Sequence, residues 1–243
     1  APNSGSEVVR LTNEYYRPGI HKYDPYRWPI GLSEGIWQQA NVDIGFLHQT
    51  NALPRPDYEK PVIMNELVFG GFTPEALAYD GLIRDPSQRL SYRRTFWRMF
   101  TYGGGGCGEA TWLDLKAPVD EAVLDVMRDH ARLLEVLESL KVDLNTTEAH
   151  PEVALEAPGQ ASCRAALGQE YVIYLLLEPG ESAPEGTVRL ALPAGDYQAR
   201  WLNPATGASL GEQPLEAGAG PTTLASPAFT EDIVLRITAA GLL

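Results

Sequence analysis

Two different hydrophobic rhythms divide this chain of 243 residues. Residues 1–143 alternate short apolar runs with stretches of helical spacing, whereas residues 144–243 contain only strand-like runs between Gly- and Pro-rich turns. The first rhythm is typical of α/β folds and the second of antiparallel β-sandwiches. We therefore predict an α/β domain over 1–143 and a β-sandwich over 144–243, whose clearest strands are 171–177, 187–193, 196–204 and 232–238.

Four apolar runs in the first part predict parallel strands. They span 27–33, 42–50, 61–66 and 105–113, and helical spacing is found at 34–40, 87–104 and 119–141. Strands that alternate with helices pair in parallel through crossover connections. Ligand sites in such folds gather at the carboxyl ends of the strands, so polar residues at those ends are the first candidates for function.

A carboxylate closes the third of these runs, where Asn65 and Glu66 follow Met64 directly. Polar residues also end the neighbouring runs, at His48 and from Glu109 to Trp112. Glu66 is either a solvated strand end or a catalytic group. In glycoside hydrolysis two carboxyl groups flank the scissile bond, and in retaining enzymes one of them is the nucleophile. Glu66 is thus a candidate catalytic carboxylate, and Asn65 either orients a sugar hydroxyl or is structural.

Three further side chains are candidates for binding a sugar. His48 offers hydrogen bonds, and the indole faces of Trp37 and Trp112 can stack on a sugar ring, although all three residues fit a structural role as well. No second histidine stands at ligand spacing, so we expect no metal site. No organic cofactor is implied either.

Four consecutive glycines, Gly103 to Gly106, invite comparison with a phosphate-binding loop. They lack the Gly-Lys-Ser/Thr ending of such loops and follow a predicted helix instead of opening one, so we reject a phosphate site. Glycine tolerates close approaches that other residues do not. The run therefore predicts a strand entry at which the backbone passes close to another part of the fold.

Composition narrows the range of partners. The formal net charge of −13 repels phosphate backbones, so we expect no nucleic-acid partner. No stretch approaches the roughly 20 apolar residues of a membrane span, so we expect no membrane partner. Cys107 and Cys163 lack the spacing of a metal site or a disulfide framework, and we interpret them as two unlinked apolar residues.

Four segments, taken in order, resemble the later strands of (β/α)8 glycoside hydrolases of the two-glutamate superfamily, and most of all its apiosidase-like group. They are HKYDPYRWPIGLS, VDIGFLHQT, KPVIMNELVFGG and RRTFWRMFTYGGGGCGEATW. The last 100 or so residues are similar to the β-sandwich that follows such barrels, a domain described as collagen-binding. The resemblance implies a glycosidase of retaining type, with Glu66 as nucleophile, His48 in the pocket and Trp112 as its aromatic floor.

The same resemblance numbers the four strands five to eight of a (β/α)8 barrel, so the first half of the barrel would be missing. Asn13-Glu14 is then the local candidate for the acid/base. If residues 8–16 form strand four, Glu14 is the acid/base; if they form the helix before strand five, which we favour, Glu14 is a surface residue. We expect this chain to dock on an N-terminal barrel portion or on a second copy of itself.

The resemblance further implies a carbohydrate substrate and a location outside the cell or in the periplasm. Two other readings stay open. One is a non-catalytic carbohydrate- or matrix-binding protein, whose sandwich binds around Tyr197 and Trp201. The other is a fragment that is inactive alone because it lacks the acid/base residue, since general acid help contributes about 10²–10⁴-fold to the rate.

Overall fold

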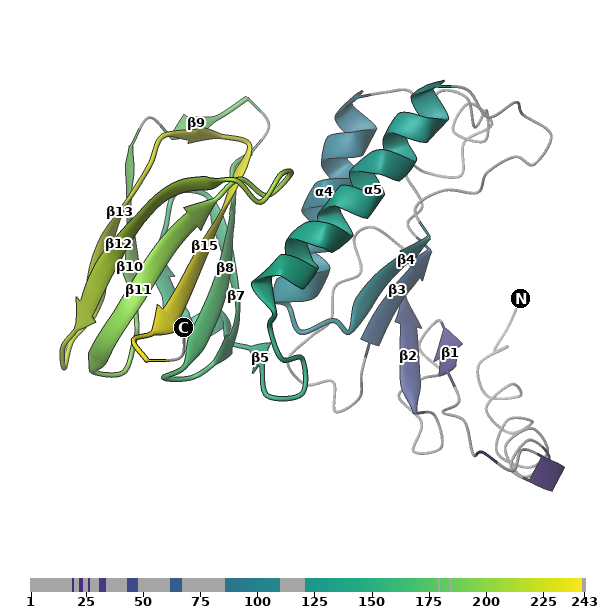
Figure 1. Cartoon of the computed structure of the whole chain (residues 1–243), viewed down its shortest axis with the longest axis horizontal. Coiled ribbons are helices and arrows are strands. Elements are labelled where there is room, and N and C mark those ends of the chain that lie inside the picture. The colour runs from purple at the N-terminus through teal and green to yellow at the C-terminus, as the bar shows by residue number, and fades with distance from the viewer. Residues whose placement is uncertain are drawn as a thin grey trace, which may run out of the picture.

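The computed structural model describes residues 19, 22–23, 26, 31–33, 43–47, 62–66, 86–109, 121–178, 180–183 and 185–241. Strands outnumber helices in this part of the chain. Figure 1 shows a small parallel sheet on one side and larger antiparallel sheets on the other, with two helices between them. These helices are α4 (Pro86–Thr101) and α5 (Glu121–Leu140), close to the bounds that helical spacing predicts. The helix predicted at 34–40 lies outside the described residues.

The four predicted strands of the first part pair in parallel, in the order β1-β2-β3-β4. They are β1 (Gly31–Ser33), β2 (Ile44–Leu47), β3 (Val62–Glu66) and β4 (Gly106–Glu109). Each strand therefore lies beside its neighbour in sequence. Within the described residues β1 and β4 are the two edges of this sheet, so the strands form an open sheet and not a closed barrel.

The second part of the chain is antiparallel throughout its described strands. A six-stranded sheet has the order β12-β11-β15-β8-β7-β5, a three-stranded sheet the order β13-β10-β6, and β14 pairs with β9. A 3-10 turn, Pro151–Val153, precedes β6. The strands are β5 (Glu148–Ala149), β6 (Ala154–Glu156), β7 (Gln160–Ala166), β8 (Glu170–Leu176), β9 (Ser182–Ala183), β10 (Gly186–Leu190), β11 (Gly195–Leu202), β12 (Ser209–Ala217), β13 (Thr222–Ser226), β14 (Phe229–Thr230) and β15 (Asp232–Ala239).

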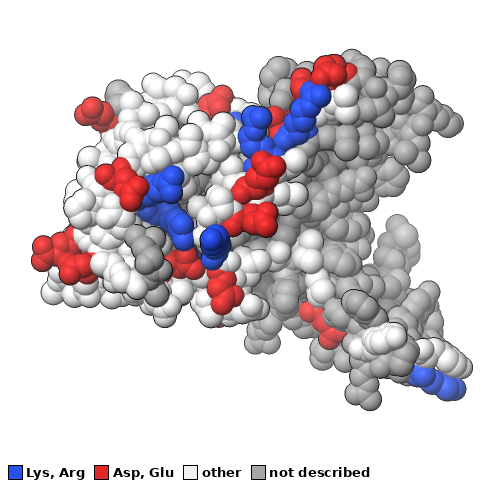
Figure 2. Space-filling model, in the orientation of Figure 1, with Lys and Arg blue, Asp and Glu red and all other residues white. Residues whose placement is uncertain are grey.

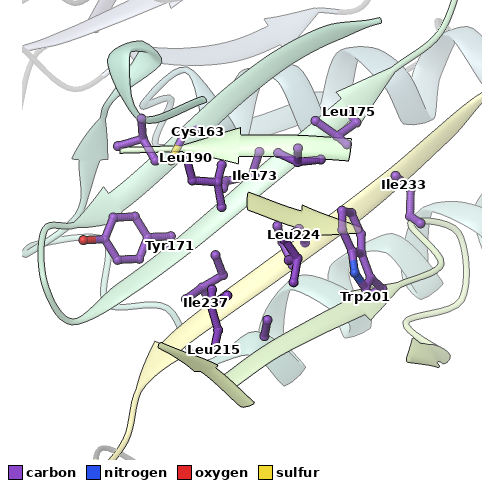
Figure 3. Close-up of a cluster of buried hydrophobic side chains, with 14 of the residues drawn as sticks. Cys163, Tyr171, Ile173, Leu175, Leu190, Trp201, Leu215, Leu224, Ile233 and Ile237 are labelled. Carbon is purple, nitrogen blue, oxygen red and sulfur yellow. The ribbon is translucent and has the colours of Figure 1, made fainter. Parts of the chain in front are cut away.

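One hydrophobic core joins the six-stranded and three-stranded sheets (Figure 3). Alternate residues of the long strands β8, β11 and β15 contribute to it, as the period of two in a β-strand requires. Its large buried members include Tyr171, Ile173, Leu175, Leu190, Trp201, Ile233, Leu235 and Ile237. Cys163 lies in the same core, and burial raises the pKa of its thiol, so the prediction of an apolar role is confirmed for this cysteine.

A second core lies on the other face of the six-stranded sheet. Here Val172, Tyr174 and Val234 pack with the buried side chains of α4 and α5, among them Trp97, Phe100 and Val136. Strand β8 is therefore buried on both faces, which explains why YVIYLLL reads as a continuous apolar run and not as an alternating one. Val62 of β3 belongs to the same cluster, so α4 is packed between the parallel sheet and the antiparallel one.

Polar contacts fix the position of α4 on the antiparallel sheet. The indole of Trp97, which is fully buried, donates to the carbonyl oxygen of Pro204 at 3.0 Å and stacks on Tyr174 at a centroid distance of 6.0 Å. Arg93 donates to both carboxylate oxygens of Asp232, at 2.9 and 2.6 Å. Burial alone would lower the pKa of Arg93, but the bonds and charges of Asp232 and Glu231 outweigh burial and raise it.

Arg164 of β7 is the buried cation at the end of α4. Its Nη1 donates to the carbonyl oxygens of Phe100, at 3.3 Å, and of Gly104, at 2.8 Å, and its Nε donates to the Thr147 hydroxyl at 2.8 Å. The guanidinium also lies 5.3 Å from the centroid of the Phe100 ring. Burial lowers the pKa of Arg164. The cation donates to carbonyl oxygens at and just after the end of α4, and it lies at the negative end of the helix dipole.

Candidate functional site: the carboxyl edge of the parallel sheet

Two glutamates end neighbouring strands of the parallel sheet. Glu66 is the last residue of β3 and Glu109 the last residue of β4, and the parallel register places these two residues opposite each other. Neighbouring strands lie about 4.8 Å apart. The two strands run in the same direction (Figure 1), so both glutamates lie at the carboxyl edge of the sheet, where parallel folds bind their ligands.

The turn after α4 sets this register. Gly103, with φ of +89°, ends the helix, and the N–H of Gly104 donates to the carbonyl oxygen of Met99 at 2.8 Å, as in a Schellman motif. The N–H of Gly105 then donates to the carbonyl oxygen of Val62 at 2.7 Å. This bond starts the pairing of β4 with β3, and four residues after Gly105 the pairing brings Glu109 opposite Glu66.

The same turn confirms the close approach predicted from the glycine run. A Cβ atom on Gly104 would lie 2.7 Å from the carbonyl oxygen of Met99, which is closer than real side chains come. Among the described residues, none comes closer than 3.7 Å to the equivalent position on Gly105. The run is therefore a helix end followed by a strand entry, which is the structure that we predict for it in place of a phosphate loop.

The structure describes two of the six residues selected from the sequence. Asn65 and Glu66 are the last two residues of β3, which is the strand-end position predicted for them. Glu14, Trp37, His48 and Trp112 lie outside the described residues. Their proposed roles therefore stay predictions.

Glu109 is a candidate site residue that the sequence analysis does not select. The pattern places it near the end of a predicted strand but gives no reason to prefer it over Trp112. Only the register with β3 singles it out, because that register pairs it with Glu66. Both observed strands end in a glutamate, but the run predicted at 105–113 extends past Glu109, so the sequence does not mark this residue as a strand end.

The structure also bears on whether the chain binds a metal ion or crosses a membrane. Within the described ranges, no three His, Cys, Asp or Glu side chains are grouped as metal ligands would be. Neither α4 nor α5 has the length and apolarity needed to cross a bilayer.

The alternative sugar-binding surface is not found where we predict it. Tyr197 and Trp201 are 4% and 3% exposed, so the prediction of a sugar-binding surface centred on these two side chains is wrong. Trp201 instead packs in the core between the sheets, as Figure 3 shows.

No family model matches the chain, and no curated protein matches its sequence. Solved structures do match its fold. A family 5 glycoside hydrolase from Bacteroides vulgatus ATCC 8482 superposes with a TM-score of 0.61 at 12% identity, over 92% of this chain and 58% of that one. Another structure, described as a glycoside hydrolase, superposes with a TM-score of 0.54 at 12% identity, over 83% and 53%. The chain thus spans a little over half the length of these structures, and over that span its fold is similar to that of glycoside hydrolases.

Proposed function

We propose that this chain carries part of the active site of a retaining glycoside hydrolase, with Glu66 as the nucleophile and a carbohydrate as the substrate. The observation that carries the proposal is the position of Glu66 at the carboxyl end of β3, in register with Glu109. The similarity in fold to glycoside hydrolases supports it. In this mechanism the Glu66 carboxylate attacks the anomeric carbon while a carboxylic acid protonates the leaving oxygen. The same group, now a carboxylate, takes a proton from water, and this water attacks the anomeric carbon and releases the sugar from Glu66.

We assign β1 to β4 to strands five to eight of a (β/α)8 barrel. Open doubly wound sheets reverse their strand order at a switch point, whereas barrel strands follow one another around the axis. The sequential order β1-β2-β3-β4 is of the second kind. A whole barrel takes about 250 residues, so the remaining strands would come from outside residues 1–143.

The second carboxyl group has two candidates within this chain. Glu109 lies opposite Glu66, and when two carboxylates share a site the pKa of one of them rises, so that it can hold a proton. Glu14 is the candidate that the family resemblance provides, should residues 8–16 form strand four. A third source is the remaining half of the barrel. Activity of this chain by itself depends on which of these supplies the acid.

An apolar groove supports the proposal that another part of the barrel covers these helices. The groove has a volume of about 440 Å³ and lies between α4, α5 and the Gly104–Gly105 turn. Leu134, one of its lining residues, is 56% exposed. Because this chain covers only 53% and 58% of the two similar structures, we propose that the N-terminal portion of the barrel is the occupant.

The catalytic proposal is tested by the variant Glu66→Gln. The substitution is made in the longest natural protein that contains this chain, and activity is assayed with a panel of aryl glycosides. Removal of the nucleophile should lower kcat by about 10²–10⁴-fold or more. Glu216→Gln, which changes an exposed glutamate on β12, is the matched control and should leave kcat unchanged. Activity of Glu66→Gln within about tenfold of the unchanged protein would refute the role of Glu66.

Two further variants identify the acid group. Glu109→Gln and Glu14→Gln are assayed with substrates whose leaving groups differ in pKa. Loss of the acid slows poor leaving groups far more than good ones, because only poor ones need protonation. The glutamate whose variant shows this difference is the acid/base, and if neither variant does, the group comes from the rest of the barrel.

The groove proposal is tested by sedimentation and by binding of a hydrophobic dye. A monomer of this chain should bind the dye at the groove, and Leu134→Lys should reduce that binding without loss of secondary structure. A dimer that Leu134→Lys dissociates would identify a second copy of the chain as the occupant instead.

A further inference from the structure

A cleft between α5 and the six-stranded sheet gathers three arginines. Arg132 comes from α5, Arg200 from β11 and Arg236 from β15, and the cleft that they line has a volume of about 360 Å³. In Figure 2 basic side chains are seen on both sides of the junction between the antiparallel sheet and the helices. None of the described residues that line this cleft belongs to the parallel sheet.

Two of the three arginines lie directly opposite each other. The register of β11 and β15 pairs Arg200 with Arg236. Opposite residues in an antiparallel pair have Cβ atoms about 5 Å apart, and like charges at that spacing destabilise the sheet. A repulsive pair on the surface of a chain with a net charge of −13 is unexpected unless something neutralises it.

The described residues neutralise this pair only in part: Glu212 of β12 lies opposite Arg200 on the other side of β11, and no hydrogen bond or ion pair joins these two side chains. The Nε atom of Arg236 is buried without a hydrogen-bond partner, and its ion pair with Glu170 is long, at 3.7 Å. Within the described part of the chain, Arg132 and Arg200 have no hydrogen bond or ion pair from their side chains. Glu135 is the one acidic residue among those that line the cleft, against three arginines.

The cleft suits an oxyanion in shape and chemistry. Planar guanidinium groups bind carboxylate, sulfate and phosphate through paired charge-assisted hydrogen bonds. Hydroxyl groups of Ser139 and Thr206 also line the cleft. Its volume lies at the lower end of the range for small-molecule sites, which corresponds to an inorganic anion or a ligand of about one sugar ring.

We propose that this cleft is a binding site for a small oxyanion, either free or as the acidic group of a sugar. Arg200 and Arg236 hold the anion from the sheet, and Arg132 faces it from α5. Binding offsets the repulsion between the two opposed arginines. The site does not depend on the hydrolase proposal, since none of its residues takes part in that chemistry.

The test is thermal unfolding and calorimetric titration of the whole chain with sodium phosphate, sulfate and glucuronate. Chloride at matched ionic strength and neutral glucose serve as negative controls. A ligand that binds only the folded state raises Tm with saturation. We expect the oxyanions to raise Tm in this way while chloride and glucose do not. Tighter binding of glucuronate than of phosphate would identify an acidic sugar as the ligand, and the reverse order a free anion.

Arg200→Gln and Arg236→Gln should each weaken anion binding by about tenfold or more, as expected for the loss of charge-assisted hydrogen bonds. Without anion and at low salt, Arg200→Gln should keep or raise Tm, because it removes a repulsive charge. Arg189→Gln is the matched control on β10, where Arg189 donates to Glu156 at 2.6 Å, and it should bind anions like the unchanged chain.

Two results would contradict the proposal of an anion-binding site. One is an equal rise of Tm in the unchanged chain and in both variants, which would be a general salt effect. The other is a fall of Tm in Arg200→Gln without anion, together with no saturable binding to the unchanged chain. That pair of findings would make the arginines structural.

Discussion

At the scale of single residues, the lack of a side chain at Gly104 in the turn after α4 affects the position of Glu109. Gly104 is buried against the carbonyl oxygen of Met99, and its own carbonyl oxygen accepts a hydrogen bond from Arg164. The next residue begins the pairing of β4 with β3. Glycine at this position therefore allows the register that brings Glu109 opposite Glu66.

Gly104→Ala should destabilise the fold, whereas Gly105→Ala should not. The added methyl group of the first variant meets backbone atoms at 2.7 Å, and overpacking of this kind costs about 1–3 kcal/mol. The added group of the second variant has only ordinary contacts, so its effect on the free energy of unfolding should stay within about 0.5 kcal/mol. Urea unfolding of both variants measures the difference. Equal midpoints would show that the turn adjusts without cost.

At the scale of elements, α4 is the part that joins the two kinds of sheet. One side of the helix contacts the parallel strands through the cluster that contains Val62, and the other side covers β8 and β15. Its polar contacts with Asp232 and Pro204 fix the angle at which it lies on the antiparallel sheet. Tyr174 contributes to both effects, because its ring stacks on Trp97 and its hydroxyl donates to Asp232 at 2.8 Å.

The environment of Tyr174 predicts a loss of stability at alkaline pH. Burial, followed by the negative charge of Asp232, raises the pKa of Tyr174 well above its ordinary value near 10, and burial raises the pKa of Tyr171 to about 12. Above pH 10 the unfolded chain releases protons that the folded chain retains. The free energy of unfolding should therefore fall as the pH rises above about 10, by up to about 1.4 kcal/mol per pH unit for each such tyrosine.

The variant Tyr174→Phe measures how much of the alkaline loss of stability comes from Tyr174. At pH 7 the variant should be less stable by about 1–2 kcal/mol, because Asp232 loses a hydrogen bond. Between pH 10 and 11.5 its stability should fall less steeply than that of the unchanged chain, so the two curves approach each other. Urea unfolding at several pH values measures both slopes. Parallel curves would mean that Tyr174 does not contribute to the alkaline loss.

At the scale of the whole molecule, the helices cover a face of the antiparallel sheet that is apolar. Val172, Tyr174, Leu202 and Val234 are buried under α4 and α5. Removal of the helices would expose these side chains together and would leave Arg164 without its carbonyl partners from Phe100 and Gly104. The antiparallel sheets thus depend on residues before 144, and the boundary at 143/144 predicted from the sequence stays a prediction.

Two shortened chains test this dependence. Residues 86–243 retain both helices and should unfold in one cooperative transition. Residues 144–243 expose the apolar face and should aggregate or bind a hydrophobic dye, since contiguous apolar surface of this kind promotes association. Size-exclusion chromatography and thermal unfolding followed by circular dichroism distinguish the two. A monomeric, equally stable 144–243 fragment would show that the antiparallel sheets form an independent unit.

Prediction from the sequence succeeds where a local pattern determines the structure. The helical spacing of 119–141 and the closing glycines of 87–104 give α5 and α4 to within a few residues. The apolar runs give β2, β3, β8 and β15. The sequence pattern does not predict strands β7, β12 and β13. Their residues are mixed in polarity, and only pairing with neighbouring strands makes them strands.

The sequence by itself determines that a carboxylate ends a strand at Glu66, because an apolar run and its polar end are adjacent along the chain. Tertiary structure alone decides which residues stand opposite each other. The pairs Glu66 with Glu109, and Arg200 with Arg236, arise from strand register, which depends on turn geometry and on packing between segments distant in sequence. Local pattern fixes the element to which a charge belongs, and only the packed fold sets which other charge it faces.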